Sequence, residues 1–288
     1  MLFSSQTEAL NHRFGIMQAV DIMMDAGYPA IDMSLFSRNE FLFTEDWRNT
    51  ALRLKEKADS RGVIFNQAHA PFGGGYDHYT SVLVPQFPRV FAFCELLGVK
   101  QIIVHPLQRG RYYGHEQELF EMNMEFYRSL IPLADAHGIR IAIENMWQSH
   151  PVTHRICDDV CANPHELRAY YKALNDPVHF TVCLDIGHVA LCGREPEDAI
   201  RVLGHDCLGA LHVHDVDYVS DLHQLPGMGK INWDRVLHAL ADIRYTGELT
   251  LEADGFLHRY DDEYLPTATK FMADTARYMT GKLKNFMG

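Results

Sequence analysis

The sequence has no long apolar run, no paired cysteines and few basic residues, and each shortage excludes a class of protein. No apolar stretch approaches the roughly 20 residues of a membrane-spanning helix, so we expect no membrane association. Residues 1–8 lack the basic and apolar segments of a secretion signal. The six cysteines are scattered without a Cys-x-x-Cys pair, which favours buried, reduced thiols. These absences predict a cytoplasmic protein.

Acidic residues outnumber basic ones. Lys and Arg total 26 against 38 Asp and Glu, which gives a formal net charge of −12. Proteins that bind nucleic acid neutralise phosphates with Lys and Arg, and no dense basic cluster occurs here. A nucleic-acid partner is therefore not expected, and bound cations would offset part of the negative charge.

Helical and strand patterns alternate along all 288 residues, which indicates parallel βαβ units. Eight units favour an α/β fold of the closed (β/α)8 TIM barrel type over an open sheet. No linker or repeat divides the chain, so residues 1–288 are expected to form a single domain. We expect strands at 2–4, 30–33, 64–68, 101–104, 139–143, 180–184, 208–211 and 248–251. Helices are expected at 13–26, 45–60, 84–97, 116–137, 196–203, 233–243 and 262–284, with another opened by Pro164.

Six of these strands run into a residue type that binds metals. An apolar strand gains no packing energy from a charged or imidazole side chain at its last position. In a TIM barrel, the carboxyl ends of the strands carry the reactive site. The sequence therefore predicts one polar site built from His69, His105, Glu144, Asp185, His212 and Glu252.

The last four of these residues form a mixed set of oxygen and nitrogen ligands. Such a set suits a divalent cation such as Mn²⁺, Zn²⁺, Co²⁺ or Mg²⁺, and the absence of thiolates argues against a structural zinc site. A metal that binds a carbonyl and a neighbouring hydroxyl acidifies the adjacent C–H group. Glu144 and Glu252 would then remove and return the proton. No organic cofactor is expected.

Each residue also has a structural interpretation. His69 or His105 alone could end a strand through a hydrogen bond, and Asp185 could cap the following helix. Their joint occurrence on successive strand ends favours a site. We expect His212 to be the ligand and His214 to point away from it, as a supporting group or a surface residue.

Two loops near the predicted site have open roles. The glycines at 73–75 lack the Lys and Ser/Thr of a phosphate-binding loop, which favours a flexible turn. The segment 145–163 is long for a barrel loop, and loops of this length are usually functional. A lid over the site and surface packing are equally good interpretations of its polar and aromatic residues, Trp147, His150, His154 and Arg155.

Several motifs resemble those of the xylose isomerase-like barrel superfamily, which holds sugar phosphate isomerases and epimerases and the type IV endonucleases. The motifs lie at 143–145, 184–188, 211–215, 226–233 and 245–252. The resemblance implies one central Mn²⁺-like ion bound by Glu144, Asp185, His212 and Glu252. It also implies an acid/base pair of Glu144 and Glu252, with His188 orienting substrate oxygens. We expect the substrate to contact His69, His105, Trp147 and Lys230.

The endonuclease branch uses three zinc ions, and its further ligands also have counterparts here. His69 and His105 match the ligands of the first ion, and His188, Asp221 and His223 match those of the third. Isomerases of the superfamily also keep these residues, so the ligands alone do not choose a chemistry. Ketose 3-epimerases carry an Arg shortly after the His at the end of strand seven. The corresponding residues of this chain, 217–220, include no Arg, which argues against that subtype.

The acidic balance favours sugar chemistry. We therefore expect a divalent-metal-dependent isomerase or epimerase that acts on a small sugar, sugar phosphate, polyol or hydroxy-keto compound. The alternatives are a trinuclear zinc phosphodiesterase of the endonuclease IV type and a related metal-dependent dehydratase. The substrate's phosphorylation is left open, as is the choice between a monomer and a homo-oligomer.

Overall fold

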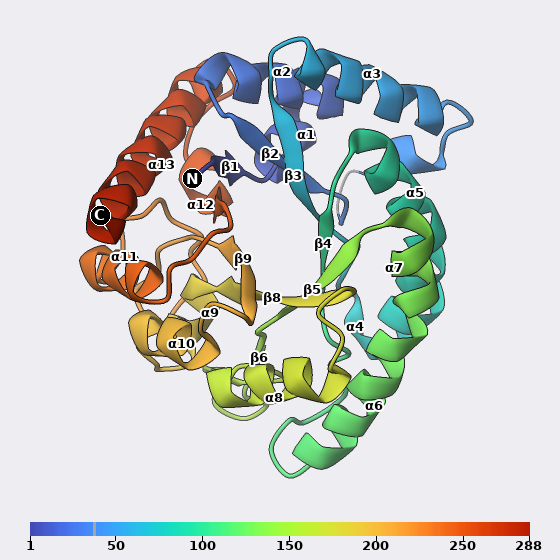
Figure 1. Ribbon diagram of the computed structural model, residues 1–288, viewed down its shortest axis with the longest axis vertical. Coiled ribbons are helices and arrows are strands. Elements are labelled where there is room, and N and C mark those ends of the chain that lie inside the picture. The colour runs from blue at the N-terminus through green and yellow to red at the C-terminus, as the bar shows by residue number, and fades with distance from the viewer. Residues whose placement is uncertain (37–38) are drawn as a thin grey trace.

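A computed structural model, describing residues 1–36 and 39–288, has eight parallel strands at the centre and a ring of helices around them (Figure 1). The strands are β1 (Phe3–Ser5), β2 (Ala30–Ser34), β3 (Ile64–His69), β4 (Gln101–Val104), β5 (Arg140–Glu144), β8 (Phe180–Asp185), β9 (Leu208–His212) and β10 (Leu249–Leu251). Hydrogen bonding joins β2, β3, β4, β5, β8 and β9 into one sheet and pairs β1 with β10. The predicted (β/α)8 fold is confirmed.

Backbone hydrogen bonds on two sides join this sheet to the pair of β1 and β10 and so close the barrel. On one side, Thr7 N donates to the carbonyl oxygen of Asp32, which joins the end of β1 to β2. On the other side, Val213 N donates to the carbonyl oxygen of Thr250, and Glu252 N donates to that of Val213. These bonds hold Glu252 beside the end of β9, although β10 itself ends one residue earlier.

The barrel wall is buried on both of its faces. Its inner face includes a small apolar cluster of Ile103, Ala142, Cys183 and Ala210. The outer face packs against the apolar sides of the surrounding helices, in one continuous core. Strands buried on both faces read as nearly continuous apolar runs, which explains why the sequence pattern located all eight.

The helices form the outer layer of the barrel and its short connections. They are α1 (Glu8–Phe14), α2 (Ile16–Ala26), η1 (Glu40–Phe43), α3 (Trp47–Asp59), α4 (Gly75–His78), η2 (Tyr79–Leu83), η3 (Val84–Gln86), α5 (Phe87–Leu97), α6 (Glu116–Ser129), α7 (Ile131–His137), α8 (Pro164–Leu174), α9 (Ile186–Leu191), α10 (Pro196–Leu203), α11 (Trp233–Asp242), α12 (Asp254–Leu257) and α13 (Leu265–Met287). Helix α13 lies against α2 and β1, so the two ends of the chain pack together (Figure 1).

Two predicted helices are each broken in the structure. The helix expected at 116–137 is divided into α6 and α7 at Leu130, because Pro132 has no N–H group and its ring excludes a continuous helix. The helix expected from residue 13 begins at Ile16. Gly15, with φ of +77°, separates it from the additional helix α1.

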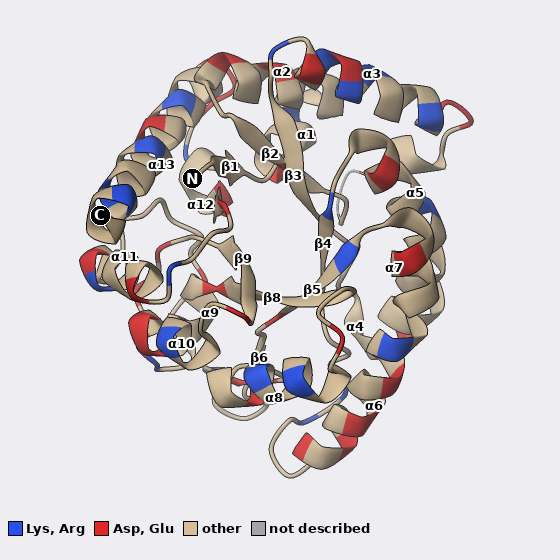
Figure 2. Cartoon of the chain, in the orientation of Figure 1, with Lys and Arg blue, Asp and Glu red and all other residues tan. Residues whose placement is uncertain are grey.

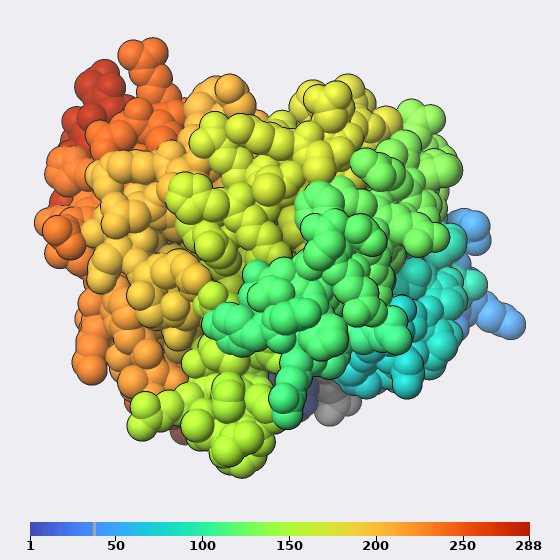
Figure 3. All heavy atoms as spheres, turned by 90° about the horizontal axis from the view of Figure 1, so that it is seen from below, coloured from blue at the N-terminus to red at the C-terminus, as the bar shows by residue number. Residues whose placement is uncertain are grey.

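The segment after β5 is partly ordered as a hairpin. Its antiparallel strands are β6 (Trp147–Ser149) and β7 (Ile156–Asp158). Segments from the middle of the chain, coloured green to yellow, occupy the middle of the face shown in Figure 3, between later segments in orange and earlier ones in cyan. Residues of both charge signs are interspersed over the outer helices (Figure 2). Among the described residues, no helix combines the length and apolar character that crossing a membrane requires.

Candidate metal centre

Four side chains meet at the carboxyl ends of the strands. Glu144, Asp185 and His212 end β5, β8 and β9, and Glu252 follows β10. One ligand atom from each lies within 4.8 Å of the others, and all four residues are buried. Nδ1 of His212 lies 2.7 Å from Oε1 of Glu144 and 3.1 Å from Oε2 of Glu252. The four residues predicted to bind one cation are therefore assembled around a common centre.

Glu144 also faces two histidines on its other side. Its Oε2 atom lies 3.4 Å from Nε2 of His69 and 3.0 Å from Nε2 of His105. The ring of Phe72 packs against both imidazoles, at centroid distances of 4.9 Å and 4.2 Å. This packing directs the two Nε2 atoms toward the carboxylate.

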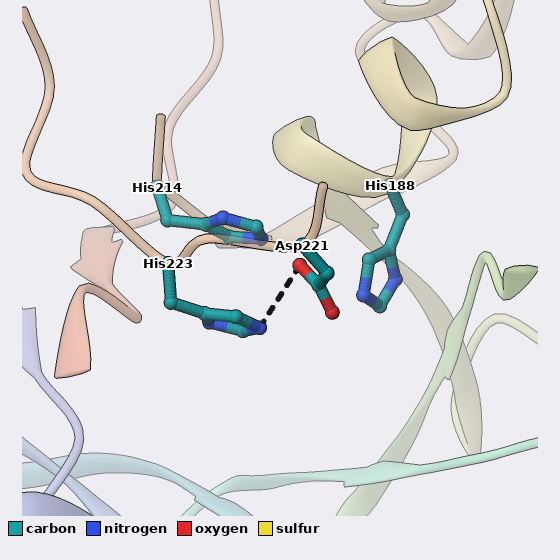
Figure 4. Close-up of side chains that lie close together, drawn as sticks. All are labelled: His188, His214, Asp221 and His223. Carbon is teal, nitrogen blue, oxygen red and sulfur yellow. Dashed lines mark ion pairs between the residues drawn. The ribbon is translucent and has the colours of Figure 1, made fainter. Parts of the chain in front are cut away.

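A third group lies next to Asp185 and contains His188, His214, Asp221 and His223 (Figure 4). The rings of His214 and His223 are stacked with centroids 4.0 Å apart. Nε2 of His223 lies 3.2 Å from Oδ1 of Asp221, and Nε2 of His214 lies 3.0 Å from Oδ1 of Asp185. The residues predicted as additional ligands thus form two clusters that flank the central four.

Hydrogen bonds to the backbone fix the orientation of three of these histidines. Nδ1 of His69 lies 2.9 Å from the carbonyl oxygen of Ala70. Nδ1 of His188 lies 2.8 Å from the carbonyl oxygen of Asn145, and Nδ1 of His223 lies 2.8 Å from that of Glu252. Because a carbonyl only accepts, each Nδ1 carries the proton. In a neutral ring, Nε2 then has a free lone pair, which is the usual state of a metal-binding histidine.

The spacing of these atoms fits a bound cation. Ligands held about 2.1 Å from one ion in a tetrahedron lie about 3.4 Å apart. The two contacts of Glu144 Oε2 with His69 and His105 are close to this value. Despite these short distances, Oε2 of Glu144 and Oδ1 of Asp221 are buried without a well-aligned hydrogen bond. Buried, unpaired oxygens beside imidazole lone pairs are suited to metal coordination.

The acidic groups at this centre influence each other's protonation. Burial opposes ionisation of Glu144, but His212 and His105 outweigh it and hold the pKa of this carboxyl well below its usual range. Burial raises the pKa of Glu252, and the negative charges of Glu144 and Asp185 add to this increase. Loss of hydration lowers the pKa of His105 to about 4. A divalent cation would relieve the repulsion among the carboxylates.

Two residues that the sequence did not assign to the site support Asp185 and the loop after β9. The side chain of Asn145 accepts from Asp185 N at 2.8 Å and donates to its carbonyl oxygen at 3.0 Å. The carboxylate of Asp215 is fully buried and accepts from the backbone N–H groups of Val216, Gly227 and Ile231. It also accepts from Nε1 of Trp233 at 2.9 Å. Asp215 therefore links the motifs at 211–215 and 226–233, between which Asp221 and His223 lie.

Of the two roles predicted for His214, a supporting group or a surface residue, the surface role is wrong. This residue is completely buried, so it is not a surface group. Strand β9 ends at His212, and the chain then turns to bring Asp215 beside Gln224. Side chains two positions apart in a strand share a face, and His214, like His212, reaches the central group, with its Nε2 3.0 Å from Oδ1 of Asp185.

A cavity of about 280 Å³ opens above the metal-ligand groups. Its walls include Phe72, Tyr76 and Trp147, and its floor includes Glu144 and Glu252. Among the predicted substrate contacts, His69, His105 and Trp147 line this cavity. The side chain of Lys230 is exposed and lies outside the lining. On the insertion, His154 and Arg155 are exposed, so only its first part contributes to the cavity.

Comparison with known proteins relates the chain to one family. The family of xylose isomerase-like TIM barrels matches residues 20–274. A protein of Methanocaldococcus jannaschii, MJ1311, is 27% identical over 159 residues, which cover 54% of this chain and 51% of that protein. The match thus spans about half the length of that relative.

Solved structures share the fold at low identity. A D-tagatose 3-epimerase-like protein has a TM-score of 0.76 and 18% identity, over 98% of this chain and 99% of that one. The IolI protein with a bound zinc atom has a TM-score of 0.73 and 18% identity, with 98% of both chains covered. The 3-keto-D-glucoside 4-epimerase YcjR from E. coli has a TM-score of 0.71 and 17% identity, over 96% of this chain and 99% of that one.

Proposed function

The chain belongs to the family of xylose isomerase-like TIM barrels, and from this we propose that it is a divalent-metal-dependent isomerase or epimerase of a small sugar or related hydroxy-keto compound. The observation that carries the proposal is the convergence of Glu144, Asp185, His212 and Glu252, two of which, Glu144 and Glu252, line a cavity. Structural relatives named as sugar epimerases, and a zinc atom bound to one relative, support it.

The cavity suits a small substrate. Its volume of about 280 Å³ lies at the lower end of the range for ligand pockets. The aromatic rings of Phe72, Tyr76 and Trp147 offer apolar surface to the C–H faces of a sugar. The carboxylates and imidazoles on the floor offer partners for its hydroxyl groups.

The chemistry proposed is proton transfer at the carbon next to a carbonyl. A divalent cation held by the four residues would polarise the carbonyl and acidify that C–H group. Glu144 and Glu252 approach the centre from the ends of different strands, and both carboxylates contact Nδ1 of His212. Either carboxylate can accept the proton, and the other can return it to the substrate. His188, whose Nδ1 donates to the carbonyl oxygen of Asn145, would orient a substrate oxygen.

Solvent deuterium uptake tests this proposal directly. The metal-loaded protein is incubated in D₂O with ketoses and their phosphates, and we expect deuterium at the carbon beside the carbonyl of the true substrate. Glu252→Gln should keep the fold and abolish the exchange. Glu248→Gln is the matched control, because Glu248 lies near the start of the same strand, at the other end of the barrel. Exchange that survives in Glu252→Gln would show that the proton-transfer scheme is wrong.

A second candidate is a trinuclear zinc phosphodiesterase of the endonuclease type. The two flanking clusters favour it, because they supply ligands for ions on either side of the central four. About three zinc ions per chain, together with cleavage of a duplex that contains an abasic site, would establish this alternative. The small cavity and the net charge of −12 favour the sugar substrate.

A further inference from the structure

A line of polar side chains crosses the barrel interior below the metal centre. Asp32, Gln67, Gln101 and Arg140 belong to the neighbouring strands β2, β3, β4 and β5. The sheet register pairs Asp32 with Gln67 and Gln101 with Arg140. Asp32, Gln67 and Gln101 are buried, at depths that TIM barrels usually fill with branched apolar residues. Burying these polar side chains is costly, so the layer is expected to have a structural or functional role.

Hydrogen bonds join these side chains in a single direction. Nη2 of Arg140 donates to Oε1 of Gln101 at 3.3 Å, and Nε2 of Gln101 donates to Oε1 of Gln67 at 3.4 Å. Nε2 of Gln67 then donates to Oδ2 of Asp32 at 3.0 Å. Each group donates toward Asp32, so the chain begins at a guanidinium and ends at a carboxylate. The chain compensates part of the cost of burying this carboxylate.

The carboxylate of Asp32 faces the imidazole of His212. Oδ2 of Asp32 lies 3.7 Å from Nε2 of His212, and both residues are 1% exposed. Nε2 of His212 and Oδ1 of Asp32 are both buried without a hydrogen-bond partner. The nearer oxygen, Oδ2, accepts from Gln67 and keeps a second lone pair, and an unpaired buried N–H of His212 is costly unless it bonds to such an acceptor.

An irregularity in the sheet helps to place Asp32 there. The pairing of β2 with β3 shifts by one residue between Ile31 and Asp32, so that Ile31 pairs with Phe65 and Asp32 with Gln67. Bulges of this kind redirect side chains and are frequent beside functional sites. The shift aligns Asp32 with the end of the glutamine chain.

We propose that Asp32 is a positioning residue that holds the proton of His212 on Nε2, and so presents the lone pair of Nδ1 to the cation. The inference rests on the proposed metal centre. Glu144 and Glu252 face Nδ1 of His212, and Asp32 faces Nε2. A neutral imidazole carries one proton. With the cation on the Nδ1 side, the proton is on Nε2, and the Asp32 carboxylate is its acceptor.

The same role is filled differently at the other histidines. His69, His188 and His223 donate Nδ1–H to backbone carbonyls, which leaves Nε2 for coordination. His212 has the opposite orientation, with Nδ1 toward the centre, and a side-chain carboxylate behind it. Carboxylates behind metal-binding histidines raise the basicity of the ring, and their loss typically weakens metal binding by about 10- to 100-fold.

The test compares metal binding in three variants of the full chain. Asp32→Ala removes the acceptor, Asp32→Asn keeps the shape and one acceptor oxygen, and Thr181→Val is the control. Thr181 is buried on β8, and its hydroxyl donates to the carbonyl oxygen of Cys207, outside the polar chain. The dissociation constant of Zn²⁺ is measured by competition with a chelating indicator, and the absorption spectrum of bound Co²⁺ reports ligand geometry. His212→Ala identifies the signal of the central ion.

We expect Asp32→Ala to weaken Zn²⁺ binding at the central site by about 10- to 100-fold and to change the Co²⁺ spectrum. Asp32→Asn should restore part of the affinity, and Thr181→Val should match the parent protein in both measurements. If Asp32→Ala does not fold, Asp32→Asn decides, because an unchanged affinity and spectrum there would overturn the inference. If the parent protein binds neither Zn²⁺ nor Co²⁺, the proposed function fails as well. If the parent protein binds metal and the Asp32 variants bind it equally well with the same spectrum, the inference about Asp32 is overturned and the proposed function stands.

Discussion

Gly187 and His214 are in contact with no room for a methyl group between them: a Cβ atom on Gly187 would collide with the ring atoms of His214. The ring cannot move aside easily, because it is stacked on His223 and lies 3.0 Å from Oδ1 of Asp185. The glycine in the motif at 184–188 therefore lets α9 approach the residues that support Asp185.

Replacing this glycine should destabilise the protein. We expect Gly187→Ala to lower the free energy of unfolding by about 1–3 kcal/mol, as overpacking of a buried contact does. Gly281→Ala is the matched control in α13, where an added Cβ meets no neighbouring atom within 4 Å. Alanine at an exposed helical position should stabilise the chain by about 0.5–1 kcal/mol. Denaturant unfolding measures both, and an equal effect of the two changes would contradict the packing described.

Asp215 should be more important for stability than its position outside the ligand set suggests. It accepts hydrogen bonds from three backbone N–H groups and the indole of Trp233. Asp215→Ala leaves these donors without their acceptor, and we expect a loss of about 3–5 kcal/mol in unfolding free energy. For comparison, Asp242→Asn breaks only an exposed contact with Arg201 and should cost less than about 1 kcal/mol. A loss below 1 kcal/mol in Asp215→Ala would refute this role.

Glu166 should make stability depend on pH. Burial raises the pKa of this carboxyl to about 7, with further contributions from Asp158 and Asp159, against the hydrogen bonds from Tyr112 and Cys161 N. In the unfolded chain the pKa is about 4.3. Because the folded state binds the proton more tightly, stability falls as the pH rises from about 4.3 to about 7, and it changes little above that.

The comparison with Glu166→Gln isolates this effect. The carboxyl is partly exposed, so solvent screening reduces the penalty to about 1–2 kcal/mol at pH 8 relative to pH 4. Unfolding free energies of the parent and the variant, measured across this range, should converge at low pH and separate above pH 7, with the variant more stable. A constant difference at every pH would exclude Glu166 as the titrating group.

Metal should stabilise the folded protein. Because the ligands are assembled only in the folded state, free metal at 100 times the dissociation constant adds about 2.7 kcal/mol to stability. We expect Tm to rise by several degrees with Mn²⁺ or Zn²⁺ and to fall after treatment with a chelator. Asp185→Asn should reduce this dependence. Identical melting curves of the parent protein with and without metal would argue against a preassembled site.

The sequence predicted the barrel and its strand ends because each strand is a short apolar run that stops at a polar residue. The end of β9 illustrates where such reasoning stops. The expectation that His214 points away from His212 conflicts with strand geometry, in which side chains two positions apart share a face. The burial of His214 depends on the segment that pairs Asp215 with Gln224 and stacks His223 on its ring. Alternation along a strand gives the face to which a side chain points, whereas its burial depends on the segments that the fold places over it.

Other features were not accessible for the same reason. Asp32 appears as one acidic residue in an expected strand, and its position opposite His212 requires the closed barrel and the shifted pairing of β2 with β3. The support that Asn145 gives to Asp185 joins residues 40 positions apart. Residue types and strand ends indicate which groups reach the site, whereas the contacts that orient them depend on the folded structure.

The metal content of the purified protein tests the central claim most directly. After equilibration with Mn²⁺ or Zn²⁺ and dialysis, elemental analysis of the parent protein should find at least one divalent ion per chain. The double variant His212→Ala, Glu144→Ala should lose that ion while circular dichroism shows an intact fold. A parent protein that retains no more metal than this variant would contradict the assignment of Glu144, Asp185, His212 and Glu252 as one cation site.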